Sequence, residues 1–458
     1  MKIVMIALDT LRADHLSCYG WRFPTTPRID QWAEQAVLFE RCYASDVPTP
    51  PSYTAMFSGR FGMHNGIFGF QSADSYRRGA PMIQEVLAKA GFETCAVSNL
   101  CYPCPWLLPG WGTIMPPGRR FQGGRAPDVT NTALRWLDQN GNAENTFLFV
   151  HYWEPHQPFT KAPEEHRVLF PTAQYEEIAS DLRIINDNTI MRAFREVYHE
   201  RNEGDAHLSS AEIMARYDSQ THFVDAEVGR LLETLDDDTT VIIVSDHGEA
   251  FGEYGTFDHL TCYDNIAHVP LLIRTPQAKT GAHVKGLVYG ADLMPTVLEL
   301  AGCEVPDGID GCSLVPCLEG RADGTREYVV SDTNSLATQR MLIRDTWSLV
   351  HTINPGAYTH MQPYELFDLE GDCEADMTAD NPELAHELRL LLEDWVVAQT
   401  GGGPDPLQAA AATGGWTFNH GCLVEAVRQN LGAAQANTVF WETFRRHHGG
   451  AVRMLGSR

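Results

Sequence analysis

The chain has 458 residues, a hydrophobic content of 43% and a formal net charge of −26 at pH 7. This length and apolar content suffice for one large domain with a buried core and a smaller second one. The negative charge argues against nucleic-acid or anionic-membrane partners, because both are bound through basic patches. An anionic substrate would have to be held by local cations.

The sequence indicates a cytoplasmic protein. No stretch approaches the roughly 20 apolar residues of a membrane-spanning helix, and the apolar run that starts at residue 2 leaves no room for a leader peptide. The eleven cysteines are odd in number and several lie in apolar segments. This usage is typical of reduced thiols rather than of a disulfide framework.

Strand and helix patterns alternate from residue 2 to residue 302, as they do in α/β proteins. Apolar runs predict strands, and amphipathic periodicity ended by glycine or started by proline predicts helices. We therefore expect an α/β/α sandwich with a mostly parallel central sheet. The predicted strands are 2–8, 93–97, 146–151, 240–244 and 269–274, and the predicted helices are 28–36, 83–91, 129–139, 211–235 and 292–301.

The pattern changes after about residue 325. Short strand patterns lead into a helix at 382–398, which predicts a small α+β subdomain over 326–400 behind a large domain over 1–325. A glycine-rich break then precedes a tail over 401–458, with helical patterns at 421–430 and 436–446. We predict that this tail docks on a neighbouring subunit, so that the protein is a homo-oligomer.

Two predicted strands end in side chains that bind metals. Asp246 and His247 follow the buried run 240–244, and Asp9 follows the strand 2–8. Ligands of open α/β sheets bind beyond the carboxyl ends of the strands. Carboxylate oxygens and a neutral imidazole suit a divalent cation such as zinc or manganese. We predict that Asp9, Asp246 and His247 converge on one metal ion.

A hydroxyl-bearing segment completes this constellation. Pro48, Pro50 and Pro51 are expected to exclude a helix before Ser52, so that Thr49 or Ser52 would lie at a helix N-terminus. Backbone N–H groups there stabilise an anion, and a hydroxyl beside a divalent cation can attack phosphorus or sulfur. The alternative is that Ser52 is only an N-cap and Thr49 a loop residue.

In this order the segments resemble the sulfatase branch of the alkaline phosphatase superfamily, from residue 2 to about residue 398. The resemblance implies an alkaline phosphatase-like fold and a metal-dependent hydrolase. It is carried by residues 9–20 (DTLRADHLSCYG), 24–30 (PTTPRID), 57–60 (FSGR), 151–158 (HYWEPHQP), 245–252 (SDHGEAFG), 259–264 (HLTCYD), 292–296 (DLMPT), 307–311 (DGIDG) and 364–372 (YELFDLEGD).

The departures from the family pattern concern its nucleophile. Family sulfatases convert a Cys or Ser to formylglycine, but the aligned residue here is Thr49, which cannot be converted. Tyr53 replaces the motif Arg, Thr10 replaces the second Asp of the opening pair, and Asn99 stands where a Lys often contacts the nucleophile. Family members with a metal-bound Thr act on phosphorus. The resemblance therefore implies a covalent threonine intermediate on phosphorus rather than an aldehyde hydrate.

Carried over residue by residue, the resemblance makes Asp9, Asp246 and His247 metal ligands and makes Thr49 both a ligand and the nucleophile. His156 and His259 would hold the nonbridging oxygens or protonate the leaving group, and the ordinary pKa of histidine suits either role.

Further substrate contacts are Asn99, Lys161, Arg12 and Tyr53. Arg12 could instead orient Asp9, and Lys161 could be a solvated loop residue. Asp218 and His222, spaced i, i+4 on the helix 211–235, could share a second metal or form a simple helix-face pair.

The predicted function is hydrolysis of phosphate diesters or phosphonate monoesters, as in a phosphodiesterase. The predicted cofactor is zinc or manganese, with calcium or magnesium as alternatives. The predicted partner is a small anionic ester, with no nucleic acid and no membrane. Three alternatives stay open: a sulfatase that works without formylglycine, a transferase to an acceptor alcohol, and a noncatalytic binding protein.

Overall fold

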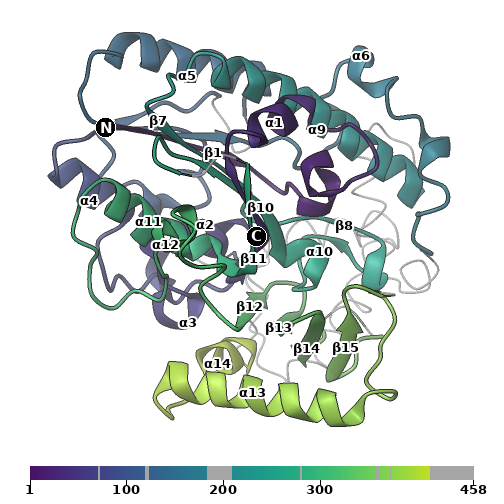
Figure 1. Cartoon of the computed structure of the whole chain (residues 1–458). Coiled ribbons are helices and arrows are strands. Elements are labelled where there is room, and N and C mark those ends of the chain that lie inside the picture. Colours follow the sequence, from purple (N-terminus) through teal and green to yellow (C-terminus); the bar gives the residue numbers. More distant parts are fainter. Residues whose placement is uncertain are drawn as a thin grey trace, which may run out of the picture.

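The computed structural model describes residues 1–70, 73–118, 123–182, 209–278, 281–356, 358, 360–371 and 373–412 (Figure 1). Within these ranges a large sheet has the strand order β11-β2-β10-β7-β1-β6-β4-β5. Its strands are β1 (Lys2–Leu8), β2 (Val37–Tyr43), β4 (Glu93–Val97), β5 (Thr113–Ile114), β6 (Thr146–Tyr152), β7 (Thr239–Val244), β10 (His268–Arg274) and β11 (Ala282–Tyr289).

The centre of this sheet is parallel. Strand β1 pairs in parallel with β6 on one side and with β7 on the other, whereas β10 runs antiparallel to both of its neighbours. All residues of β6 and β7 are buried, as expected for strands covered by helices on both faces. The prediction of a mostly parallel central sheet is confirmed.

Helices cover both faces of the large sheet. Because successive side chains of a strand point to opposite faces, Val4 and Ile6 of β1 pack in one apolar layer and Ile3 and Met5 in another. The first layer includes side chains of α1 (Pro27–Ala33), α5 (Ala126–Asn140) and α9 (Ser210–Leu232), and the second includes those of α2 (Thr49–Ser58), α4 (Ile83–Lys89), α11 (Leu293–Leu300) and α12 (Val315–Leu318).

A smaller sheet has the strand order β15-β14-β13-β12-β3. The helices α13 (Pro382–Thr400) and α14 (Pro406–Ala412) pack against it (Figure 1). Its strands are β3 (Asp46–Val47), β12 (Tyr328–Asn334), β13 (Thr338–Arg344), β14 (Trp347–Asn354) and β15 (Tyr364–Asp368). Because β3 comes directly before Thr49 in the chain, the small sheet holds the segment that leads into helix α2.

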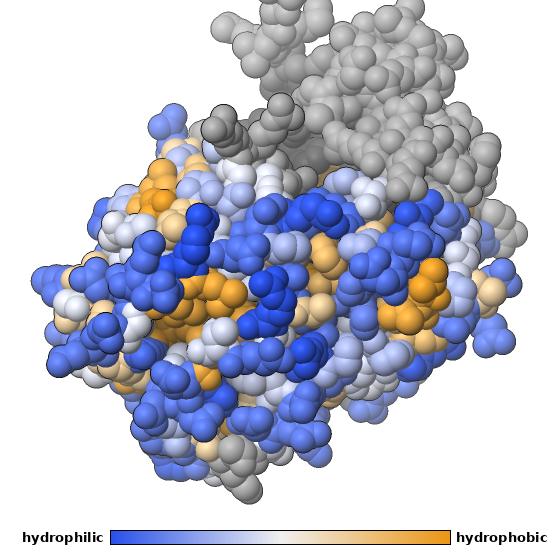
Figure 2. All heavy atoms as spheres, turned by 90° about the horizontal axis from the view of Figure 1, so that it is seen from above, coloured by the Kyte–Doolittle hydropathy of each residue, from blue (hydrophilic) through white to orange (hydrophobic). Residues whose placement is uncertain are grey.

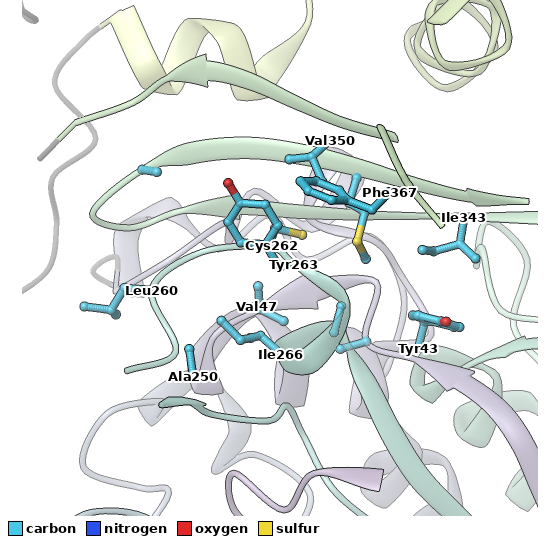
Figure 3. Packing of buried hydrophobic residues seen from close by; sticks show 14 of the residues in the cluster. Tyr43, Val47, Ala250, Leu260, Cys262, Tyr263, Ile266, Ile343, Val350 and Phe367 are labelled. Atoms are coloured by element: carbon cyan, nitrogen blue, oxygen red, sulfur yellow. The ribbon is translucent and has the colours of Figure 1, made fainter. Parts of the chain in front are cut away.

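The two sheets share one apolar core, part of which is drawn in Figure 3. Short elements contribute side chains to this core, namely α3 (Gly62–Asn65), α10 (Asp264–Ala267), β8 (Ala250–Phe251) and β9 (Phe257–Asp258), whereas α6 (Glu164–Arg167) lies against α9. The shared core packs the predicted subdomain firmly against the large domain. Buried members of the core include Tyr43, Val47, Ala250, Leu260, Cys262, Tyr263, Ile266, Ile343, Val350 and Phe367.

The surface is largely polar. The face drawn in Figure 2 is mostly hydrophilic, with apolar areas interspersed. Among the described residues no helix has the length and hydropathy needed to cross a membrane. The predicted tail helices at 421–430 and 436–446 lie outside the described residues, so docking of the tail stays a prediction.

Candidate active site

The site is built at the carboxyl ends of β1 and β7. Ala7 of β1 pairs with Val244 of β7, so Asp9 and Asp246, each two residues further along, emerge at the same edge of the sheet. One ligand atom from each of Asp9, Asp246 and His247 lies within 4.8 Å of the others, and all three side chains are buried. The structure thus brings together the three predicted metal ligands.

The two carboxylates are only partly hydrogen-bonded. Asp246 Oδ1 accepts a hydrogen bond from the backbone N–H of Thr10 at 3.1 Å. Thr10 has a left-handed conformation (φ 59°), which turns this N–H toward Asp246. Asp246 Oδ2 and Asp9 Oδ1 have no hydrogen-bond partner among the described residues. Burial raises the pKa of Asp246 to about 7, and burial followed by the charge of Asp246 raises that of Asp9 well above its usual value. Such buried, unsatisfied oxygens are costly unless a cation binds them.

His247 is a neutral imidazole with a defined tautomer. Burial holds its pKa well below the ordinary value. Its Nδ1–H donates to Gly248 O at 2.9 Å, which leaves the lone pair on Nε2. A neutral imidazole oriented in this way is the form that binds metals. The donor set of two carboxylates and this nitrogen therefore fits a divalent ion such as zinc or manganese.

Thr49 lies directly beside these ligands. Its Oγ1 is 3.0 Å from His247 Nε2, and the residue is buried. Helix α2 begins at Thr49, so the prediction that prolines exclude a helix before Ser52 is wrong. Prolines are tolerated in a first turn because their missing N–H groups would have no intrahelical partner there.

The first turn of α2 contacts the loop that carries Asp246, and it offers few N–H groups to an anion. Pro50 and Pro51 have no N–H to offer, and the N–H of Ser52 donates to Pro48 O at 3.1 Å. The hydroxyl of Ser52 donates to Asp246 O at 2.7 Å. Ser52 is therefore not an N-cap, and it couples the helix to the strand end that carries Asp246.

A buried histidine that the sequence analysis did not single out orients Asp9. His151 is on β6, next to Ala7 of β1, and its Nε2 is 3.2 Å from Asp9 Oδ2. The Ser98 hydroxyl is 3.2 Å from its Nδ1. Burial lowers the pKa of His151 to about 3, so the neutral ring donates to Asp9 and accepts from Ser98. The signal in the sequence was a histidine at the end of an otherwise apolar strand.

His259 is held as a cation between two carboxylates. Its Nδ1 is 2.6 Å from Asp258 Oδ1 and 3.2 Å from Glu249 Oε1. Burial alone would lower the pKa of His259, but the charges of Asp258 and Glu249 outweigh it and raise this pKa well above the usual value. The imidazolium offsets part of the negative charge of these two buried acids, and ligand atoms of Glu249, Asp258 and His259 also lie within 4.8 Å of one another. Its ring stacks on His247, with 4.6 Å between centroids.

His156 lies next to His259 but is uncharged. The ring centroids are 5.0 Å apart, and burial together with the charge of His259 lowers the pKa of His156 to about 3. Its Nδ1–H donates to Gln157 O at 2.8 Å, so Nε2 carries the lone pair. Sequence reasoning left both histidines with the same two roles. In the structure the two rings differ in charge, because the raised pKa of His259 favours its protonated form and the lowered pKa of His156 favours its neutral form.

Two further predicted substrate contacts are Lys161 and Asn99. The ammonium of Lys161 is 3.9 Å from Glu154 Oε1 and has no hydrogen-bond partner in the described part of the chain. Its positive charge contributes to the low pKa of His156, so it lies within reach of the site. Asn99 is buried, and its side-chain amide donates to Gly123 O at 2.5 Å.

The placement of Arg12 and Tyr53 argues against the predicted substrate contacts. The Arg12 guanidinium is buried and donates to Asp14, to Glu253 at 2.6 Å and to Glu249 O at 3.0 Å. It therefore braces the loop that follows His247. Tyr53 is completely buried and packs edge-on against the ring of His151, behind the ligands.

Asp218 and His222 do not form a shared second site. Asp218 Oδ2 accepts from Trp21 Nε1 and from the hydroxyl of Tyr175, and its Oδ1 is 2.6 Å from His15 Nδ1. His222 instead pairs with His166, 2.8 Å between their Nδ1 atoms. The two side chains make separate structural contacts on helix α9, so the structure shows neither a shared metal site nor the alternative helix-face pair.

Comparison with known proteins identifies the family. Residues 2–101 and 109–303 match the sulfatase family model, and residues 252–394 match that of the N-sulphoglucosamine sulphohydrolase C-terminal region. The chain is 33% identical over 440 residues to choline-sulfatase of Rhizobium meliloti (strain 1021), covering 83% of both chains. It is 23% identical over 460 residues to N-acetylglucosamine-6-O-sulfatase of Bacteroides thetaiotaomicron, covering 81% of each.

Solved structures show the same fold. Phosphonate monoester hydrolase SpPMH from Silicibacter pomeroyi superposes with a TM-score of 0.70 at 23% identity, over 89% of this chain and 96% of that one. At this identity the similarity concerns the fold, and the family match is what identifies the family. The chain therefore belongs to the sulfatase family, whose members are metal-dependent hydrolases of ester bonds.

Proposed function

We propose that this chain hydrolyses phosphate diesters or phosphonate monoesters, with Thr49 as the nucleophile. The observation that supports this most strongly is the position of the Thr49 hydroxyl, which lies 3.0 Å from His247 Nε2 at the edge of the Asp9, Asp246 and His247 cluster. A nucleophile must lie beside the group that activates it. A divalent ion held by these ligands would lower the pKa of the hydroxyl and offset charge on the attacked group.

The absence of a convertible residue supports direct attack by the hydroxyl. Threonine cannot become formylglycine, and Tyr53, which replaces the motif arginine, is buried behind the ligands. A formylglycine hydrate would therefore lack both the residue from which it is made and the arginine of the family motif. Thr49 itself keeps a hydroxyl at the position where the family has its nucleophile.

The charge of the site supports a singly charged substrate. Asp9, Asp246, Glu249 and Asp258 are all buried there. The positive charges left to face them would be His259 and a divalent ion, since Lys161 is balanced by Glu154 and Arg12 by Asp14 and Glu253. The carboxylates thus outnumber the available cationic charges, and a dianionic phosphate monoester would meet net repulsion. Phosphate diesters and phosphonate monoesters carry one negative charge.

In the proposed reaction Thr49 attacks as the alkoxide, its hydroxyl proton having been lost to solvent beforehand, and Oγ forms a bond to phosphorus as the bond to the leaving-group oxygen breaks. His259 gives the proton on Nε2 to that oxygen. Water then attacks the phosphoryl group on Thr49, and the electron pair of the P–Oγ bond returns to the threonine oxygen. The neutral His259 takes a proton from this water, which restores the imidazolium, while Nε2 of His156 accepts a hydrogen bond that orients the water.

Sulfate-ester hydrolysis is the second candidate, because the relative that shares 33% identity with this chain is a choline-sulfatase. A sulfate monoester is also singly charged, so the charge of the site admits it. Attack by Thr49 on sulfur would use the same hydroxyl and the same two histidines. The two candidates differ in the atom that is attacked, and kinetics can separate them.

A panel of esters with a common leaving group tests the proposal. With zinc or manganese bound, we expect kcat/KM for bis(4-nitrophenyl) phosphate or 4-nitrophenyl phenylphosphonate to exceed that for 4-nitrophenyl sulfate by at least about tenfold, and that for 4-nitrophenyl phosphate by about 100-fold. A sulfate ester that reacts fastest would favour the second candidate. A metal-loaded enzyme that cleaves none of these esters would contradict both.

A further inference from the structure

We propose that Asp258 is a positioning residue that holds His259 in the orientation for proton transfer, and that Gln157 couples this carboxylate to the loop carrying His156. This inference rests on the proposed function, in which His259 protonates the leaving group. It assigns roles to two residues for which the sequence predicted none. It is carried by a buried ion pair and the series of buried hydrogen bonds that continues from it.

A short hairpin brings the groups together. Strand β8 pairs antiparallel with β9, with Ala250 opposite Asp258. Glu249 and His259, which flank this pair, therefore lie side by side. Asp258 adopts a left-handed conformation, with φ at 69°. Such a conformation is costly for a residue other than glycine and is retained where the surrounding contacts demand it.

The left-handed turn folds the Asp258 carboxylate back onto the next residue. Its Oδ1 accepts from the backbone N–H of His259 at 2.7 Å and lies 2.6 Å from the ring Nδ1 of the same residue. Glu249 approaches this Nδ1 less closely, at 3.2 Å and 3.3 Å. Because both carboxylates hold Nδ1, the nitrogen on the other side of the ring, Nε2, is the one left to meet substrate. Glu249 thus forms the hydrogen bonds to the ring, and Asp258 adds the closer ion pair together with the hydrogen bond from the backbone of His259.

The second oxygen of Asp258 reaches the other histidine. Its Oδ2 accepts from Gln157 Nε2 at 3.0 Å, and the backbone carbonyl of Gln157 accepts from His156 Nδ1 at 2.8 Å. The loop is anchored in turn by Gln220 of α9, whose amide donates to His156 O at 2.9 Å. Asp258, Gln157 and Gln220 are all buried. The series sets the spacing of the two rings, so that a donor and an acceptor face the same substrate atoms.

The variant Asp258→Asn tests this role. Asparagine adopts the left-handed conformation readily and keeps the size of the side chain, so the hairpin should survive. It removes one of the two carboxylate charges that hold Nδ1 and leaves that of Glu249. The matched control is Asp264→Asn on the neighbouring helix α10, where Asp264 bonds to the hydroxyl of Tyr43 at 2.9 Å and does not touch either histidine. Thermal unfolding of both variants checks that they fold.

The readout is the dependence of kcat on the leaving group, since a misplaced acid matters most when the leaving group is poor. We expect Asp258→Asn to lower kcat for the phenyl ester by about 10- to 100-fold more than for the 4-nitrophenyl ester, with KM within about threefold of the parent. Asp264→Asn should keep the parent ratio between the two esters. A loss that is equal for both esters, or no loss, would overturn the proposal.

A second variant keeps the proposal testable if Asp258→Asn does not fold. Gln157→Met removes only the amide that links Asp258 to the His156 loop, and we expect a smaller change of the ester ratio in the same direction. An unchanged ratio in a folded Gln157→Met would overturn the coupling. The comparison can use whichever ester class the parent cleaves. Failure here therefore differs from failure of the proposed function, which would show in the substrate panel.

Discussion

Replacing Thr49 by alanine is expected to lower kcat/KM by at least about 10³-fold, because it removes the attacking oxygen. The neighbouring groups keep their places, since Asp246 is held by Thr10 and His247 by Gly248 O. The variant should therefore still bind a metal ion and fold normally. Steady-state kinetics with the best ester of the panel, together with metal analysis, measure both properties.

The variant Thr49→Ser is the matched control for this prediction. Serine keeps the hydroxyl and loses only a methyl group, so we expect it to retain activity within about 100-fold of the parent. An alanine variant that retains more than about a tenth of parental kcat/KM would show that Thr49 does not supply the attacking atom. In that case a water molecule would be the attacking group.

The second large effect concerns the metal ion. We expect Asp246→Asn to reduce bound zinc or manganese from about one ion per chain to below about 0.1, and kcat/KM by at least about 10³-fold. The reason is that Asp246 contributes a buried carboxylate oxygen with no other hydrogen-bond partner among the described residues. Elemental analysis after dialysis gives the metal content, and activity is measured with and without added metal.

Chelation of the parent gives the companion result. Activity should be lost with the metal and return when zinc or manganese is added, whereas Asp246→Asn should not be rescued. The control Asp264→Asn, a carboxylate outside the cluster, should keep its metal. A chelated parent that stays fully active, or an Asp246→Asn variant with a full complement of metal, would contradict the assigned ligands.

The fold can be predicted from the sequence where a strand is buried on both faces, because such a strand is a continuous apolar run. Strands β1 and β7 are apolar nearly throughout because helices cover both of their faces, and strands 2–8 and 93–97 have the predicted bounds. Strands β2 and β11 were missed. Each contains charged residues, Glu40 and Arg41 in β2 and Lys285 in β11, which interrupt the apolar run. The position of β2 and β11 in the sheet depends on pairing between segments that are far apart in the sequence.

The candidate site was predictable to a similar degree. Asp9, Asp246 and His247 follow buried strands, and their convergence follows from the parallel pairing of β1 with β7. The partners that orient them were not predictable in this way. His151 reaches Asp9 because β6 is the other neighbour of β1. The order of strands in a sheet cannot be predicted from the local sequence pattern of each strand.

The roles of Arg12 and His259 show the same limit. Arg12 follows Asp9 closely in the chain, but its buried guanidinium bonds to Glu253, far away in sequence. The charge of His259 depends on Glu249 and Asp258, which only the β8–β9 hairpin places around its ring. Residue types and spacing thus indicate a site, whereas its protonation states depend on tertiary contacts.

The most direct test of the central claim is mass spectrometry of enzyme quenched with acid during turnover of the preferred ester. If Thr49 is the nucleophile, the peptide that contains it will gain the mass of the transferred phosphoryl or phosphonyl group, and fragmentation will locate the group on Thr49. The Thr49→Ala variant will show no such gain. A group found on another residue, or turnover through a step in which Thr49 is never modified, would contradict the account.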